Sequence, residues 1–296
     1  MQLSNKLIIV TSFLAISLLL IISSCQKQDT GLTNPTNGKK LSLYLTDAPC
    51  QYDSVFIDIR YVEVKVDTSN EHMSDDHFGD TDNDGDDDHQ HHDGFGKWDT
   101  LIINPGIYNI LQLRNGIDTL LGTGNLPLGS IRKIRLTLGT NNSLVNAGIK
   151  YPLSLLAGTN NYVYIKIHKE DEDDEDEITS AQSSIWIDFN VCESIKLIDG
   201  QYFLKPFFKP FGMKNFGKLE GKVLPDAAHA FVSASNGTDS ASTIPEENGE
   251  YKIRGLKKGT YSVRFKGSGG YNDTTITNIE VQKGKETHIP TVTLHL

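Results

Sequence analysis

The sequence is poor in the residues and motifs that mark several common classes of protein. It has three cysteines, three methionines and two tryptophans in 296 residues. It contains no HExxH, GxSxG or CxxC motif, and no phosphate-binding glycine loop that leads into a helix. Acidic residues outnumber basic ones by 38 to 28, and the resulting formal charge of -10 repels nucleic acid. We therefore expect a protein that is not an enzyme and has no nucleic-acid partner.

Long apolar runs are absent except at the N-terminus. There, Lys6 precedes a largely apolar run of sixteen residues, Leu7 to Ile22. This run is shorter than the roughly 20 residues that cross a bilayer as a helix, and small residues follow it, as in an export signal. The tetrad Ile-Ser-Ser-Cys at 22–25 resembles a bacterial lipobox. The resemblance implies that residues 1–24 are removed as a lipoprotein signal peptide and that Cys25 carries lipid.

The residues behind the lipidated cysteine are typical of a tether. Residues 25–40 contain the Gly, Pro and Asn of a flexible linker. The segment QKQDT at 26–30 resembles the Gln-Lys-acidic tag of surface lipoproteins in one Gram-negative phylum, although Asp29 is its single acid where two are usual. Each buried acyl CH₂ contributes about 0.8 kcal/mol, so two or three chains would hold the protein on a membrane. We expect a lipid-anchored outer-membrane protein displayed at the cell surface, with a periplasm-facing location as the alternative.

The rest of the chain is dominated by apolar residues that alternate with polar ones. This period of two, bounded by Gly, Asn, Asp or Pro, predicts half-buried strands. Only residues 107–113 and 154–156 suggest short helices. We expect an all-β chain, mainly antiparallel, with two β-sandwich domains in tandem. The segment KPFGMKNFGK at 209–218 separates them, so that the domains span 41–212 and 217–296.

The larger domain carries several motifs in a characteristic order. These are LYLTDAP (43–49), YDSVFIDIRYVEV (52–64), LLGTGNLPLGSIRKIRLTLG (120–139), WIDFNVCESI (186–195) and QYFLKPFFKP (201–210). Together they resemble the family known as domain of unknown function 4382, which is common in bacterial lipoproteins. The resemblance implies no catalytic residues, because the family has no established activity.

The smaller domain carries the motif GEYKIRGLKKGTYSVRF at 249–265. It resembles the carboxypeptidase regulatory-like domain, a transthyretin-type sandwich that is grouped with carbohydrate-binding-like folds. The resemblance makes a surface glycan a possible ligand. Sugar sites need exposed aromatic faces beside polar groups, and Tyr271, after the turn GSGG, is a candidate.

Two further sets of residues have a predicted role in the larger domain. Asp47, Asp53 and Asp188 lie at the expected strand ends, where carboxylates usually cap turns; a buried carboxylate cluster is the alternative. Cys50 and Cys192 are the only thiols left once Cys25 is lipidated, and disulfides persist in exported proteins. We therefore predict a disulfide between Cys50 and Cys192.

An acidic insertion at 72–94 is the strongest candidate metal site. Asp80, Asp82, Asp84, Asp88 and His91 occupy positions 1, 3, 5, 9 and 12 of a calcium-type loop. A histidine replaces the usual glutamate at position 12, so a true EF-hand is not expected. Weakly held calcium is the first possibility, and zinc or another transition ion that accepts histidine nitrogen is the second. A solvated spacer without ligand is the alternative to both.

These observations favour a non-enzymatic binding or structural protein on the outer membrane, with a surface glycan or a protein as partner. A glycan-binding module and a divalent-metal binder are the alternatives. Exposed aromatic residues on one sheet face would favour the glycan, and ordered Asp and His ligands would favour the metal.

Overall fold

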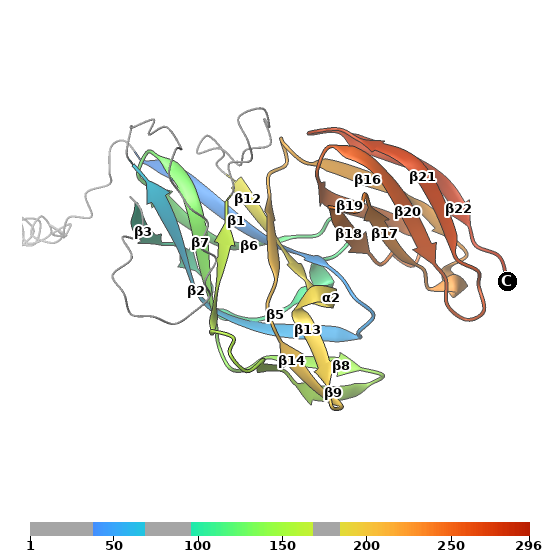
Figure 1. Ribbon diagram of the computed structural model, residues 1–296, viewed down its shortest axis with the longest axis horizontal. Coiled ribbons are helices and arrows are strands. Elements are labelled where there is room, and N and C mark those ends of the chain that lie inside the picture. Colours follow the sequence, from blue (N-terminus) through green and yellow to red (C-terminus); the bar gives the residue numbers. More distant parts are fainter. Residues whose placement is uncertain (1–37, 69–95, 168–183) are drawn as a thin grey trace, which may run out of the picture. The chain divides into compact units, whose positions relative to one another are not determined.

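The computed structural model describes residues 38–68, 96–167 and 184–296. These residues form mainly β-strands, arranged in five sheets (Figure 1). Two separate hydrophobic cores are present, and they divide between Phe216 and Leu219. The prediction of an all-β chain with two sandwich domains is confirmed. Within the described ranges, no helix has the length and apolar character that a membrane crossing requires.

The first layer of the N-terminal sandwich is a five-stranded sheet in the order β15-β12-β1-β6-β4. Its strands are β1 (Lys39–Ala48), β4 (Ile102–Ile103), β6 (Thr119–Leu126), β12 (Ser184–Asn190) and β15 (Phe208–Phe211). Most strand pairs are antiparallel, as expected, but the neighbours β1 and β12 run parallel. They are far apart in the sequence, so no tight hairpin forces them to be antiparallel.

The second layer is a seven-stranded sheet built around the long strand β2. Its path is β11-β7-β2-β8-β9, and β3 and β5 also pair with β2. The strands are β2 (Ser54–Asp67), β3 (Lys97–Thr100), β5 (Gly106–Asn109), β7 (Ser130–Leu138), β8 (Ser143–Asn146), β9 (Ile149–Pro152) and β11 (Tyr162–Lys166). Strand β2 alternates on either side of a register shift between Ile59 and Tyr61, and beyond the shift Val62 and Val64 are fully buried while Tyr61 is exposed. Its apolar side chains face the first sheet across the core, and its polar side chains form the outer face.

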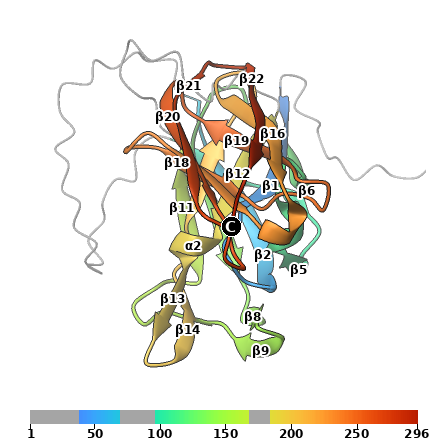
Figure 2. The same ribbon diagram turned by 90° about the vertical axis from the view of Figure 1, so that its right-hand side faces the viewer.

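A small third sheet completes the N-terminal domain. It contains β10 (Ser154–Leu155), β13 (Ile195–Ile198) and β14 (Gln201–Leu204). The 3-10 helix η1 (Ile110–Leu113) and the one-turn helix α2 (Val191–Ser194) connect strands. The hairpins β8–β9 and β13–β14 lie side by side in both views (Figures 1 and 2), where the ring of Tyr202 packs 5.0 Å from that of Tyr151. The helices suggested at 107–113 and 154–156 are instead a strand followed by η1, and the strand β10.

The C-terminal sandwich packs a three-stranded sheet on a four-stranded one. The sheets have the orders β19-β16-β22 and β18-β17-β20-β21. The elements are β16 (Gly217–Leu224), η2 (Asp226–Ala228), β17 (Phe231–Ser235), β18 (Ser240–Thr243), β19 (Glu250–Leu256), β20 (Gly259–Lys266), β21 (Thr274–Val281) and β22 (Glu286–Thr293). Tyr251 of one sheet and Phe265 of the other meet edge to face in the core, with centroids 5.7 Å apart.

Polar contacts join the two sandwiches. Arg254 of β19 donates to the carboxylate of Asp118 at 2.9 Å, and the indole N–H of Trp186 donates to the same oxygen at 2.9 Å. Lys209 of β15 forms an ion pair with Asp239, which lies before β18. The Arg254–Asp118 and Lys209–Asp239 pairs each take one partner from each domain, so they tie the outer face of the five-stranded sheet to the second sandwich.

Candidate functional site

The outer face of the seven-stranded sheet carries four aromatic side chains beside charged ones. Residues that pair directly across strands point to the same side of a sheet. Tyr61 of β2 pairs with Thr137 of β7, and Thr137 pairs with Tyr162 of β11. Trp98 of β3 pairs with Lys65 of β2. Lys65 lies two residues after Glu63 in the same strand, so both side chains point to this face. The register therefore places aromatic residues from β2, β3 and β11 on one surface.

The rings of this surface form a nearly continuous row. Tyr162 and Tyr164 have ring centroids 5.2 Å apart, and Tyr164 and Trp98 have centroids 6.0 Å apart. Tyr164 is 45% exposed and Tyr61 is 63% exposed. We call Tyr61, Trp98, Tyr162 and Tyr164 the aromatic patch. Exposed rings of this size offer a large apolar contact area, and each tyrosine adds a hydroxyl for hydrogen bonding.

An ion pair within the patch fixes its polar groups. The guanidinium of Arg135 donates to both carboxylate oxygens of Glu63, each at 2.7 Å. Such a bidentate pair is strong and directional, and the hydrogen bond to Glu63 raises the pKa of Arg135 above its ordinary value. The guanidinium carbon also lies 4.7 Å from the ring centroid of Trp98, a cation–π contact. Glu63 takes up two of the five guanidinium donors. The patch thus combines ring faces with the Glu63 carboxylate and the Arg135 guanidinium, whose positions are fixed by their ion pair.

Tyr271, the aromatic residue that the sequence suggested for a sugar site, has a different role. It is partly buried and packs against the core of the C-terminal sandwich. A Cβ added at Gly267 would lie 2.8 Å from the Cβ of Tyr271, so the loop backbone at Gly267 passes close to Tyr271. Edge packing, the usual role of a single loop aromatic residue, accounts for its position.

Sequence reasoning missed the aromatic patch although its signal is present. The segment YVYIK places Tyr162 and Tyr164 two residues apart, and Tyr61 takes a polar-face position of β2. Alternation was used to find the buried face of each strand. The same alternation puts Tyr162 and Tyr164 on the exposed face, where large apolar residues are informative. Tyr61 reaches that face through the register shift between Ile59 and Tyr61.

The three aspartates of the proposed carboxylate cluster are only partly brought together. Asp53 accepts a hydrogen bond from the backbone N–H of Gly148 at 2.8 Å, and thus caps a turn. Asp47 is buried, and neither carboxylate oxygen has a hydrogen-bond partner among the described residues. Burial and the nearby Asp188 carboxylate raise the pKa of Asp47 well above its usual range. Burial also raises the pKa of Asp188 to about 6, against the opposing charges of Lys209 and Arg254.

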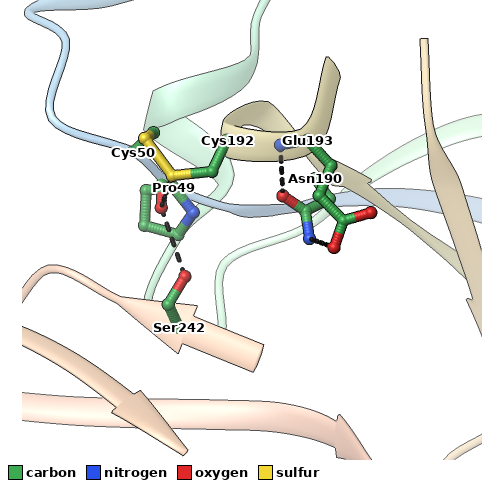
Figure 3. Close-up of a disulfide and its surroundings, with 6 residues drawn as sticks. All are labelled: Pro49, Cys50, Asn190, Cys192, Glu193 and Ser242. Atoms are coloured by element: carbon green, nitrogen blue, oxygen red, sulfur yellow. Dashed lines mark hydrogen bonds between the residues drawn. A yellow bond between two sulfur atoms is a disulfide. The ribbon is translucent and has the colours of Figure 1, made fainter. Parts of the chain in front are cut away.

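The predicted pair of cysteines lies at one end of the N-terminal sandwich. Figure 3 shows Cys50 and Cys192 joined by a disulfide, which links the segment after β1 to helix α2. The side chain of Asn190 caps α2 by accepting the backbone N–H of Glu193 at 3.0 Å. Next to the disulfide, the hydroxyl of Ser242 donates to the carbonyl of Pro49 at 3.2 Å. The disulfide therefore lies beside a contact between the two domains.

The remaining predicted site residues lie outside the described residues. They are the lipidation site Cys25 and the metal-loop residues Asp80, Asp82, Asp84, Asp88 and His91. Within the three described ranges, no group of three or more His, Cys, Asp or Glu side chains could hold a metal ion.

Two family models match the chain in tandem. A domain of unknown function (DUF4382) matches residues 39–206, and a carboxypeptidase regulatory-like domain matches residues 219–295. Both families, and their order, are those that the sequence motifs indicate. No curated protein matches the chain.

Solved structures with related segments are distant. A cohesin–X-dockerin complex from Acetivibrio cellulolyticus shares 20% identity over 26% of this chain and 56% of its own, with a TM-score of 0.23. The minor pilin of Streptococcus agalactiae shares 11% identity over 86% of this chain and 95% of its own, with a TM-score of 0.20. A family 26 carbohydrate-binding module from Eubacterium rectale, solved with maltoheptaose, shares 11% identity over 86% of this chain and 93% of its own, with a TM-score of 0.19. This chain thus covers about half of the first of these structures, and at such low TM-scores none of the three bears on its function.

Proposed function

Because a family model matches residues 39–206, the chain belongs to the DUF4382 family, and we propose that it is an exported, lipid-anchored protein that binds glycans through the aromatic patch. The observation that carries this proposal is the set of four aromatic side chains on the outer face of the seven-stranded sheet. A sugar ring presents C–H groups on its face and hydroxyls around its edge. The patch offers the matching groups, ring faces next to the paired Glu63 and Arg135.

The arrangement suits a polymer better than a small molecule. Small ligands usually bind in concave pockets that enclose most of their surface. The patch instead extends over strands β2, β3 and β11 on a sheet face that the described residues leave open. An open row of rings can contact several sugar units of one chain at once.

Removal of the patch tests the proposal. We expect the Trp98→Ala/Tyr164→Ala variant of the full chain to lose binding on a panel of soluble and insoluble polysaccharides. One aromatic contact contributes about 1 kcal/mol, which corresponds to a roughly fivefold change in Kd. Affinity electrophoresis and pull-down measure the loss.

A matched control removes an exposed aromatic residue elsewhere in the same domain. Phe207 is 44% exposed, and Phe207→Ala should leave glycan binding unchanged. Circular dichroism spectra show whether each variant is folded. If the wild-type chain binds no glycan of the panel, or if both folded variants bind like wild type, the proposal is wrong.

The lipobox at 22–25 and the tag-like segment at 26–30 support attachment to the outer membrane, with the two sandwiches facing the cell surface. In that location the patch would meet polysaccharides outside the cell. The role proposed is binding without catalysis, because the sequence contains none of the catalytic motifs considered above.

Metal binding by the acidic insertion stays a prediction. Its aspartate and histidine composition favours weakly held calcium, or zinc as the alternative. Titration calorimetry on the chain with and without residues 72–94 tests it. Heat from calcium or zinc that disappears with these residues would support the site, and the absence of such heat would leave a solvated spacer.

A further inference from the structure

A row of three lysines crosses the outer face of the seven-stranded sheet beside the aromatic patch. Lys65 of β2 pairs with Lys133 of β7, and Lys133 pairs with Lys166 of β11. On the far side of β2, Lys65 pairs with Trp98 of β3. Because neighbouring strands lie about 5 Å apart, three cationic side chains are closely spaced in line with an aromatic ring. We call Lys65, Lys133 and Lys166 the lysine row.

The lysine row is joined to the patch by a direct contact. The Lys133 ammonium lies 5.8 Å from the ring centroid of Tyr164, within the range of a cation–π interaction. A ligand that covers the Tyr164 ring would therefore come close to this charge. Lys166 is exposed, whereas Lys65 is only 6% exposed.

None of the three ammonium groups has an acidic partner among the described residues. The arginines of the same face differ in this respect. Arg135 is paired with Glu63, and Arg132 is paired with Asp67. Each of these pairs is neutral as a whole, so among the described residues the lysine row gives this part of the face a net positive charge.

The negative charge of the whole chain does not remove this local effect. The formal net charge is -10, but at physiological ionic strength exposed charges are screened over about 8 Å. A ligand group in contact with Lys133 and Lys166 responds mainly to those two ammonium groups. Like charges placed side by side without counter-charges destabilise a sheet, and an anionic ligand would relieve that repulsion.

We propose that the aromatic patch and the lysine row together bind an acidic glycan, one that carries carboxylate or sulfate groups. This inference rests on the proposed glycan function and names the class of glycan. Sugar faces stack on the rings of Trp98 and Tyr164, while the acidic substituents contact Lys133 and Lys166. Hydroxyl groups can bond to the remaining donors of Arg135.

A single-stranded nucleic acid also combines stacking faces with negative charge. The patch favours a glycan because Glu63 and Arg135 offer a carboxylate acceptor and guanidinium donors side by side, which suit the many hydroxyl groups of a sugar. Binding of an oligodeoxythymidylate is therefore an outcome of the test that would contradict the proposal.

The experiment compares two ligands that differ only in charge. Oligogalacturonate and its carboxyl-reduced, neutral counterpart are titrated into the full chain at low and at physiological salt. We expect tighter binding of the acidic form, with an advantage that shrinks as salt is added. In the Lys133→Gln/Lys166→Gln variant the acidic form should bind roughly three- to tenfold more weakly, and the neutral form should bind as before.

The control variant removes the same charge from another part of the same domain. Lys196 and Lys205 are exposed and lie at the β13–β14 hairpin, so Lys196→Gln/Lys205→Gln should not change the preference. Equal affinity for both ligands, or a preference that survives Lys133→Gln/Lys166→Gln, would overturn this inference and leave glycan binding intact. If neither oligosaccharide nor any polysaccharide of the panel binds, or if the oligodeoxythymidylate binds more tightly than oligogalacturonate, both proposals fail.

Discussion

Asp188 is an acidic side chain whose surroundings disfavour its charged form. It lies on the face of β12 that carries the contacts to the second sandwich, and burial raises its pKa to about 6 although Lys209 and Arg254 favour its charged form. Asp47, on the neighbouring strand β1, is buried without a hydrogen-bond partner among the described residues. Carboxyl groups that are buried, like Asp47, or partly buried, like Asp188, reduce stability when they must ionise.

The raised pKa of Asp188 predicts the direction of a pH effect on stability. An unfolded aspartate has a pKa of about 3.9, so the folded state holds a proton that the unfolded state releases between about pH 4 and pH 6. Asp188 should therefore make the free energy of unfolding fall as the pH rises through this range, and its contribution should level off above it, whereas Asp47 extends the fall to higher pH. We expect Asp188→Asn to make this fall smaller, as measured by chemical denaturation at pH 4, 5, 6 and 7.

The control for this prediction is Asp199→Asn, which removes one acid from an exposed hairpin turn. Its pH profile should follow wild type. If the free energy of unfolding changes with pH equally steeply for wild type and Asp188→Asn between pH 4 and 6, the pH effect does not come from Asp188.

Among the elements, the hairpin β8–β9 contains a residue that its turn does not favour. Ala147 has a φ of 50° and Gly148 a φ of 74°. This is the pattern of a two-residue turn with both φ values positive, for which Asn-Gly is the preferred sequence. The hairpin β13–β14 meets the same demand with Asp199 and Gly200.

The element-scale prediction is that Ala147→Asn stabilises the N-terminal domain by about 0.5–1 kcal/mol, because asparagine tolerates the left-handed conformation better than alanine. Ala147 is exposed, so no packing should change. Thermal unfolding followed by circular dichroism measures the gain. Ala147→Val, a β-branched residue in the same turn, should have the opposite effect, and a lower melting temperature for Ala147→Asn would count against this account.

The disulfide links two elements that are 142 residues apart in the sequence. In the chain-entropy model, closing a loop of this length stabilises the folded state by roughly 4–5 kcal/mol. We expect reduction, or Cys50→Ser/Cys192→Ser, to lower the denaturation midpoint markedly and by the same amount. Thiol labelling of denatured, unreduced Cys25→Ala protein should modify no cysteine, whereas two labelled cysteines would refute the pairing.

At the scale of the whole molecule, the two sandwiches are joined by contacts such as Arg254 with Asp118 and Lys209 with Asp239. In our proposal a lipid at Cys25 then holds this unit on the membrane. We expect Cys25→Ala to release the protein from membranes on fractionation, because the acyl chains would provide the main attachment. The variant Cys192→Ser should stay in the membrane fraction. If Cys25→Ala fractionates like wild type, the proposal of a lipid anchor at Cys25 is wrong.

Much of the fold could be predicted because it depends on local pattern. Alternation in SSIWIDFNV identified the buried face of β12, and alternation in VFIDIRYVEVKV identified β2 apart from its register shift between Ile59 and Tyr61. The motifs identified both families in their order. The parallel pairing of β1 with β12 could not be predicted, because strands so far apart can be brought together in either direction.

By itself, the sequence determined which residues alternate, and alternation identifies the core-facing side chains wherever a strand keeps its backbone period of two. In β2 that period shifts between Ile59 and Tyr61, so the structure decided which face Tyr61 takes. It also showed that Cys50 and Cys192 are the only two thiols left to form a disulfide if Cys25 carries lipid. Only the tertiary structure decided that Tyr61, Trp98 and Tyr162, from three separate strands, share one exposed face with Arg135 and Lys133. The reason is physical: cross-strand register is set by the packing of the whole sheet, and it decides which exposed residues become neighbours.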